Sequence, residues 1–369
     1  MNQLSKYDQT VTAMQKKSLI AMSGGVDSSV AAYLTQEQGL ICTGAIARFF
    51  FDKKADVDRY DDYHTHDDSR DARSAADQLG IPFYVFDFTD CFSERVIKHF
   101  IEAYERGETP NPCINCNKHL KFGKLMQRAF ELEMDKLVTG HYARIECDDT
   151  GRFLLKKGVD TGKDQSYVLY TMTQEQLSHT LFPLGNLHKT EVRKIAESQG
   201  LINTHKHESQ DICFVPDGNY AAFIKKHSKH TFPEGNIYDL NGKLLGTHKG
   251  IIHYTIGQRR GIGISSSASY YVCEIHADTN EIVVGEEHTL YSDTLFANDI
   301  NLIAYDRLES PIRAMAKIRY RHQQQPATVV QSDDNTLKIV FDTPQRAITR
   351  GQAVVLYEGD SVVGGGIIV

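Results

Sequence analysis

The chain has 369 residues, of which 41% are hydrophobic and 24% charged, and its formal net charge is −7 at pH 7. This length predicts two or three domains, and the composition predicts a packed globular core. No apolar run reaches the roughly 20 residues that span a membrane, and the polar segment 1–17 lacks the apolar core of a secretory signal, so we expect a cytoplasmic protein without membrane contact.

The first half of the sequence alternates strand and helix patterns. Short apolar runs predict buried strands at 18–22, 41–46, 83–88 and 137–139. Longer segments with helical periodicity predict helices at 28–38, 69–79, 93–104 and 118–134. This order predicts an α/β fold with a doubly wound parallel sheet, whose ligands lie at the carboxyl ends of the strands.

The pattern changes after Val215. A turn signal at 216–218 and a short helix at 220–226 are followed by a Gly-rich, short-stranded segment, and from about Glu286 the sequence predicts strands joined by turns. We therefore expect a first domain over 1–215, a central small β-rich domain over 216–285 and a C-terminal β-barrel over 286–369.

The segment SGGVDSS at 23–29 lies between the first predicted strand and the first predicted helix. Gly24 and Gly25 let the backbone approach a ligand, and the helix N-terminus offers N–H groups to an anion. Asp27 would hold Mg²⁺ or orient the turn. The segment lacks the Gly-Lys-Ser/Thr ending of a P-loop and the third spaced glycine of a dinucleotide fingerprint. It is similar to the pyrophosphate loop of the N-type ATP pyrophosphatases, which cleave ATP between its α and β phosphates.

The cysteines indicate reactive or metal-bound thiols. Cys113 and Cys116 lie in a proline-stiffened loop at 109–118 between two predicted helices, and Cys213 lies in ESQDICFV at 208–215. A Cys-x-x-Cys pair is typical of a zinc site, an iron–sulfur site or a dithiol redox centre. Zinc would need four ligands, and the second segment adds only one cysteine. We expect the other cysteines to be inert: Cys42, Cys91, Cys147 and Cys273.

Two stretches of the second half carry cations without acids, from Asp239 to Glu274 and from Glu309 to Asp333. Within the second, residues 312–321 alternate and predict a strand with cations on one face. Such a face would follow a phosphate backbone. An amphipathic edge strand with solvated charges would give the same pattern.

Six motifs in a fixed order carry a family resemblance: SGGVDSS, TPNPCINCNKHLKFG, TGHY at 139–142, GKDQSY at 162–167, ESQDICFV and YTIGQRRG at 254–261. With the glycines at 364–366 they cover nearly the whole chain, and the set resembles the tRNA-specific 2-thiouridylases. The resemblance implies that ATP adenylates the O2 carbonyl oxygen of the wobble uridine, releasing pyrophosphate, and that sulfur then displaces AMP. It implies tRNA substrates with Lys, Glu and Gln acceptors, and a sulfur-donor protein such as a cysteine desulfurase or relay protein.

The resemblance also implies residue roles. Cys213 would receive sulfur as a persulfide, and Cys116 would attack it and leave a Cys116–Cys213 disulfide. ATP would be bound, with Mg²⁺, by Ala21, Met22, Ser23, Gly24, Gly25, Val26, Asp27, Ser28, Ala47 and Gly140. The target base and tRNA would be contacted by Asn111, Pro112, Cys113, His141, Lys163, Asp164, Gln165, Arg319, Tyr320 and Gln352.

Cys113 departs from the family pattern, which often has Asp at this position. The third thiol raises a second hypothesis, in which Cys113, Cys116 and Cys213 hold a 4Fe-4S cluster through three irons and the fourth iron binds sulfide. A bare persulfide relay is the alternative. Other functions remain open from the residues alone: another pyrophosphate-loop ligase, a thiolase for another tRNA position, or a non-catalytic iron–sulfur or tRNA-binding protein.

Overall fold

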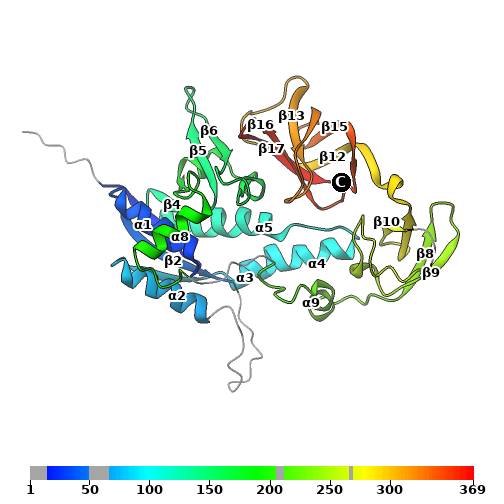
Figure 1. Cartoon of the computed structure of the whole chain (residues 1–369), viewed down its shortest axis with the longest axis horizontal. Helices are drawn as coiled ribbons and strands as arrows, with labels where there is room; N and C mark the ends of the chain where they lie inside the picture. The colour runs from blue at the N-terminus through cyan, green and yellow to red at the C-terminus, as the bar shows by residue number, and fades with distance from the viewer. Residues whose placement is uncertain (1–14, 50–65, 205–211, 266–268) are drawn as a thin grey trace, which may run out of the picture.

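The computed structural model describes residues 15–49, 66–204, 212–265 and 269–369. An α/β unit, a small central sheet and a β-barrel form the molecule, and a layer of helices runs from the α/β unit toward the two β-rich parts (Figure 1). No helix among the described residues has both the length and the apolar character needed to cross a membrane.

The α/β unit is built on a five-stranded parallel sheet with the order β3-β2-β1-β4-β7. Its strands are β1 (Lys17–Ala21), β2 (Ile41–Arg48), β3 (Phe83–Asp87), β4 (Lys136–Val138) and β7 (Thr180–Leu181). Its helices include α1 (Val26–Glu37), α2 (His66–Gln78), α7 (Gln174–Ser178) and α8 (Lys189–Ser198). Successive residues Leu19 and Ile20 pack into different buried clusters, one on each face of the sheet. The predicted doubly wound sheet is therefore confirmed.

The chain order reverses between β1 and β4. From β1 the chain moves outward to β2 and β3, and then returns to place β4 on the other side of β1. Such a reversal point is where open α/β sheets bind ligands, beyond the carboxyl ends of the strands. The residues that follow β1 and β4 are therefore neighbours, although more than 100 positions separate them in the sequence.

The helical layer differs from the sequence prediction. It contains α3 (Thr89–Phe92), η1 (Ser93–Ile97), α4 (Lys98–Glu105), α5 (Pro112–Asn115), η2 (Cys116–Leu125) and α6 (Met126–Glu131), and η1 and η2 are π-helices. The loop predicted over 109–118 ends early, because the side chain of Asn111 caps α5 by accepting a hydrogen bond from the Cys113 N–H at 3.1 Å. Pro112 at the first helical position suits this start. Cys113 and Cys116 thus lie on a helix and not in a loop.

The second half forms the two predicted β-rich parts. After α9 (Tyr220–His227), the central sheet has the order β10-β11-β8-β9. Its elements are β8 (Gly235–Asp239), β9 (Leu244–His248), η4 (Ile251–His253), β10 (Tyr271–His276) and β11 (Glu281–Gly285). After η5 (Glu287–Leu290), strand β12 (Tyr291–Leu302) pairs with both β15 and β17, which closes a barrel. The other barrel strands are β13 (Ile312–Lys317), β14 (Gln325–Asp333), β15 (Thr336–Arg346), β16 (Ala353–Glu358) and β17 (Ser361–Ile368).

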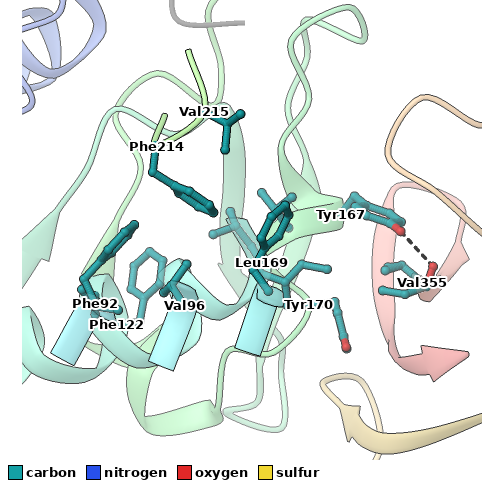
Figure 2. Close-up of a cluster of buried hydrophobic side chains, with 14 of the residues drawn as sticks. Phe92, Val96, Phe122, Tyr167, Leu169, Tyr170, Phe214, Val215 and Val355 are labelled. Carbon is teal, nitrogen blue, oxygen red and sulfur yellow. Dashed lines mark hydrogen bonds between the residues drawn. The ribbon is translucent and has the colours of Figure 1, made fainter. Parts of the chain in front are cut away.

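The barrel is docked on the α/β unit. The hairpin of β5 (Ala143–Cys147) and β6 (Phe153–Lys157) extends the barrel sheet through the pair Lys156 and Ser361. The segment η3 (Ser166–Leu169) is buried between the two units, where the Tyr167 hydroxyl donates to the Ala353 carbonyl at 2.8 Å (Figure 2). A Cβ at Gly365 would lie 2.9 Å from the ring of Tyr170. The α/β unit and the barrel therefore share a packed core.

The predicted cationic strand at 312–321 is only partly correct. Strand β13 ends at Lys317, and residues 318–321 form a turn. Arg313 is paired with Asp342 at 2.6 Å, and the Lys317 ammonium lies over the rings of Tyr167 and Tyr320 at 5.7 and 5.6 Å. No Asp or Glu lies between Glu309 and Asp333 in the sequence, but Asp342 on β15, the second strand from β13 in the sheet, pairs with Arg313. A continuous phosphate-tracking face is therefore not formed.

Candidate functional site

Residues 23–29, which we call the phosphate loop, join β1 to α1 at the point where the chain order of the sheet reverses. Gly24 has φ +74°, and a Cβ there would lie 2.5 Å from the Asp68 carbonyl oxygen, so only glycine fits. The hydroxyl of Ser28 accepts from the Ser23 N–H at 3.1 Å and donates to the Gly25 carbonyl at 3.0 Å. No side chain caps α1 at Gly25. The start of α1 is therefore suited to hold an anion.

Gly140 follows β4 and packs directly on this loop. A Cβ at Gly140 would lie 2.9 Å from the Asp27 carbonyl carbon and 3.0 Å from the Ser28 nitrogen. On another side, the Asn203 amide donates to the Gly24 carbonyl at 2.8 Å and to the Ser29 hydroxyl at 3.1 Å. Ala47 lies near the end of β2, the neighbour of β1. Sequence reasoning did not find Asn203, which lies in no motif that we singled out.

The carboxylate of Asp27 is held by two further residues that the sequence did not reveal. The Lys189 ammonium lies 2.8 Å from both Asp27 oxygens, and the Tyr142 hydroxyl donates to Oδ1 at 2.7 Å. Lys189 is the first residue of α8 and is buried. Tyr142 belongs to the TGHY motif, which could have drawn attention to it. No sequence motif around Lys189 indicates its contact with Asp27.

The three cysteines lie near one another. Cys213 precedes Phe214 and Val215, which are buried, and the Phe214 ring packs edge-on against Phe92 at 5.8 Å and Phe100 at 5.2 Å (Figure 2). This packing anchors the Cys213 segment. The motif residues 208–211 that precede it lie outside the described residues.

The thiols interact electrostatically with one another. Surrounding protein raises the pKa of Cys213 to about 12, with further contributions from Cys116 and Cys113. Burial likewise raises the pKa of Cys116 to about 11, and it raises that of Cys113. The charge of Lys121 acts against burial at all three. Cys113 and Cys213 are exposed to solvent, and Cys116 is partly exposed.

Lys121 owes its position to the π-helix η2. In a π-helix the hydrogen bonds run from i to i+5, so Lys121 lies one turn after Cys116 on the same face. Its ammonium is 3.5 Å from Nε2 of His141, a buried ring whose Nδ1 lies 2.7 Å from the Thr139 hydroxyl.

His141 is neutral in this environment. Burial first, and the charge of Lys121 second, lower the pKa of the imidazole well below its usual value. An ammonium can only donate, so Nε2 accepts from Lys121 and the Nδ1–H donates to Thr139. Because His141 is buried, it offers little surface to RNA in this conformation. Its side-chain contacts are with Lys121, Thr139 and the rings of Phe122 and Phe182.

Two segments expected to contact tRNA lie against each other. The hydroxyl of Tyr320, in the turn after β13, donates to the Asp164 backbone carbonyl at 3.2 Å. Burial raises the pKa of Tyr320, and the charges of Asp164 and Cys113 add to this, which places Tyr320 near the thiols. Lys163 and Arg319 adjoin this contact in the sequence, and both are partly exposed.

Three other residues expected to contact tRNA make hydrogen bonds within the protein. The Asp164 carboxylate accepts from the Gly158 N–H at 3.1 Å, and the Gln165 side chain accepts from the Tyr142 N–H at 3.0 Å. The Gln352 amide donates to the Thr109 carbonyl at 2.7 Å, which ties the barrel to the segment that leads into α5. These side chains fix the segments that carry them.

Metal ligands are not preassembled in the part of the chain that the structure describes. There, no group of three or more His, Cys, Asp or Glu side chains is placed so that it could hold a metal ion. The three thiols are chemically suitable ligands for an iron–sulfur cluster. Whether they hold one stays a prediction, since the ligands of a cluster bind separate irons and lie farther apart than those of a single ion.

Comparison with known proteins places the chain in a family. Family models match a tRNA methyl transferase HUP domain over residues 16–217, a tRNA methyl transferase PRC-barrel domain over 221–286 and an aminomethyltransferase β-barrel domain over 292–368. The chain is 50% identical over 356 residues to the tRNA-specific 2-thiouridylase MnmA of Clostridioides difficile, a match that covers 96% of this chain and 98% of that protein. It is 46% identical over 355 residues to the tRNA-specific 2-thiouridylase MnmA of Clostridium acetobutylicum, covering 96% of this chain and 100% of that protein. With such identity over almost the full length of both proteins, the chain belongs to the family of tRNA-specific 2-thiouridylases.

Proposed function

We propose that this protein 2-thiolates the wobble uridine of tRNA, with ATP as the activating substrate. The observation that carries the proposal is the line of contacts from the phosphate loop to the thiols. Gly140 packs on the loop, its neighbour His141 contacts Lys121, and the charge of Lys121 reaches all three cysteines. The names of the relatives support tRNA as the substrate. The family models are described by methyl transfer, but a phosphate loop beside three thiols favours sulfur transfer.

The first step is adenylation of the base. The O2 oxygen of the uridine attacks the α-phosphorus of ATP, pyrophosphate leaves, and the carbonyl oxygen becomes part of a good leaving group. The open N-terminus of α1 and the loop serines would stabilise the phosphate charge. Mg²⁺ bound with the nucleotide would neutralise further charge, and Asp27 is the carboxylate that the loop offers to it. The target base must leave the anticodon stack, and we place it against Asn111, Pro112 and Cys113.

The second step transfers sulfur. A donor protein, a cysteine desulfurase or a relay protein, leaves a persulfide on Cys213. The Cys116 thiolate attacks the Cys213 sulfur, the persulfide bond breaks, and hydrosulfide is released as a Cys116–Cys213 disulfide forms. Hydrosulfide attacks C2 of the uridine and AMP leaves. A dithiol reductant returns the disulfide to two thiols. Lys121 would stabilise the anionic sulfur in these steps.

Iron analysis separates the relay from a cluster. We assign no step to iron, because the persulfide relay balances without it. Protein purified without oxygen should be active when it contains no iron. Activity that disappears on iron removal and returns on cluster reconstitution would replace the relay by cluster-bound sulfide.

The function is tested with unmodified tRNA for Lys, Glu or Gln, ATP and a cysteine desulfurase, and the products are AMP, pyrophosphate and 2-thiouridine. Pyrophosphate release should require tRNA, whereas a pyrophosphate-loop ligase would not need it and a non-catalytic tRNA-binding protein would release none. The variant Cys213→Ser should release pyrophosphate but form no 2-thiouridine. In cells, tRNA that keeps its 2-thiouridine after deletion of the gene would contradict the proposal.

A further inference from the structure

The phosphate loop contains no cation. Residues 23–29 carry one charged side chain, Asp27, and it is negative. ATP brings several negative charges to this loop, and the loop amides and the helix N-terminus supply only partial positive charge. An unpaired Asp27 would repel the nucleotide. Apart from Mg²⁺ bound with the nucleotide, a full positive charge at the loop has to come from a residue of another segment.

Lys189 supplies that charge at the loop. Its ammonium contacts both Asp27 oxygens at 2.8 Å, and its side chain is only 10% exposed. Because burial of a charged lysine is costly unless it is paired, the position is occupied for a specific interaction. The charge lies beside the start of α1, where phosphate oxygens would bind.

The backbone of Lys189 is held firmly. Its N–H donates to the Asp160 carboxylate at 2.9 Å, and His188 and Glu191 form a reciprocal cap at the start of α8. Helix α8 packs on α1, the helix that carries the loop. The stem of the lysine is flexible and its ammonium has three donors, so the head can move within reach of the loop while its backbone stays fixed.

We infer that Lys189 is a nucleotide ligand: Asp27 holds its ammonium at the empty loop, and the ammonium binds a phosphate oxygen of ATP when the nucleotide enters. This rests on the proposed use of ATP by the loop. A purely structural ion pair between α1 and α8 would show the same contacts in the empty site, so the test must separate phosphate binding from neutralisation of Asp27.

The test is calorimetric titration with ATP, inorganic pyrophosphate and adenosine. The buffer contains EDTA, so that no divalent cation takes part. Loss of a charge-assisted bond to phosphate should raise the dissociation constants of ATP and pyrophosphate by roughly 10- to 100-fold in Lys189→Met. Adenosine affinity should not change. Lys189→Arg should recover part of the loss. Lys194→Met removes an exposed lysine from the same helix and should leave all three affinities unchanged.

The double variant Asp27→Asn/Lys189→Met decides between the two roles. If Lys189 only neutralises Asp27, removing both charges restores ATP affinity, and that result would overturn the inference. If Lys189 binds phosphate, the double variant stays at least tenfold weaker than the unaltered protein. Thermal melting shows whether Lys189→Met is folded. If it is not, the double variant still provides the test, because it replaces the ion pair by two neutral side chains. Failure of the unaltered protein to bind ATP or pyrophosphate both in EDTA and with Mg²⁺ would refute the proposed function as well, whereas normal affinity in Lys189→Met would refute only the role of Lys189.

Discussion

Replacement of Lys121 by methionine should slow the reaction of Cys116 with an alkylating reagent. Burial raises the pKa of Cys116 to about 11, so at pH 8 only about one thiol in a thousand is ionised. Lys121 opposes this effect. A unit charge one helical turn away, at about 6 Å, contributes about 3 kcal/mol at an effective dielectric constant of about 20. Partial exposure of Lys121 screens this to about 1.4 kcal/mol, which corresponds to a roughly tenfold change in thiolate population.

The assay is the rate of iodoacetamide labelling of the Cys116 peptide, followed by mass spectrometry from pH 7 to 10. Because the pKa of Cys116 is raised, the thiol is protonated at neutral pH and the rate should climb about tenfold per pH unit without a plateau. Lys121→Met should be about tenfold slower throughout this range, and Lys121→Arg should recover much of the rate.

Lys118→Met is the matched control. Lys118 lies on the same helix but pairs with Asp299 at 3.0 Å, and its charge does not contribute to the pKa of Cys116. This variant should label at the rate of the unaltered protein. Equal rates for Lys121→Met and the unaltered protein, or a plateau near pH 7, would refute the electrostatic account of the thiol site.

Three other variants probe the loop, the RNA surface and the Cys213 anchor. Gly140→Ala places a methyl group against the backbone of the phosphate loop, which must shift; it should weaken ATP binding at least tenfold in titration calorimetry and lower the melting temperature. Arg319→Ala should weaken tRNA binding and lower the slope of its salt dependence by about 1, whereas Arg313→Ala, already paired with a carboxylate, should change affinity less than twofold in the same filter-binding assay. Phe214→Ala should lower the free energy of unfolding by about 3–5 kcal/mol in urea titrations and reduce persulfide transfer through Cys213, since it empties the packed anchor. A fully stable Phe214→Ala protein would show that this ring does not hold the segment.

The parallel sheet and the barrel could be predicted from the sequence because their signals are local. Apolar runs such as 18–22, followed by glycine-terminated helices, predict buried parallel strands. Alternating segments after Glu286 specify the barrel strands. Gly24 and Gly140 could be assigned to the loop through their motifs, and the fold explains why they meet, since parallel neighbours β1 and β4 end at the same edge of the sheet.

The missing parts depend on contacts between distant segments. Lys189 meets Asp27 across 162 positions, and no pattern around either residue encodes the pair. Arg313 looked unpaired because its partner Asp342 lies on another strand. The π-helix η2 follows from packing of the helical layer, whereas its sequence reads as an ordinary helix. Yet the π-helical hydrogen-bond pattern of η2 places Lys121 on the same face of the helix as Cys116.

The central claim is that ATP activates the uridine oxygen which sulfur then replaces. It is tested most directly with tRNA whose target uridine carries oxygen-18 at O2, incubated with the protein, ATP and a cysteine desulfurase. Mass spectrometry of the nucleotide product should find the label in AMP, in equal amount to the 2-thiouridine formed. Formation of 2-thiouridine with unlabelled AMP would contradict adenylation of the carbonyl oxygen.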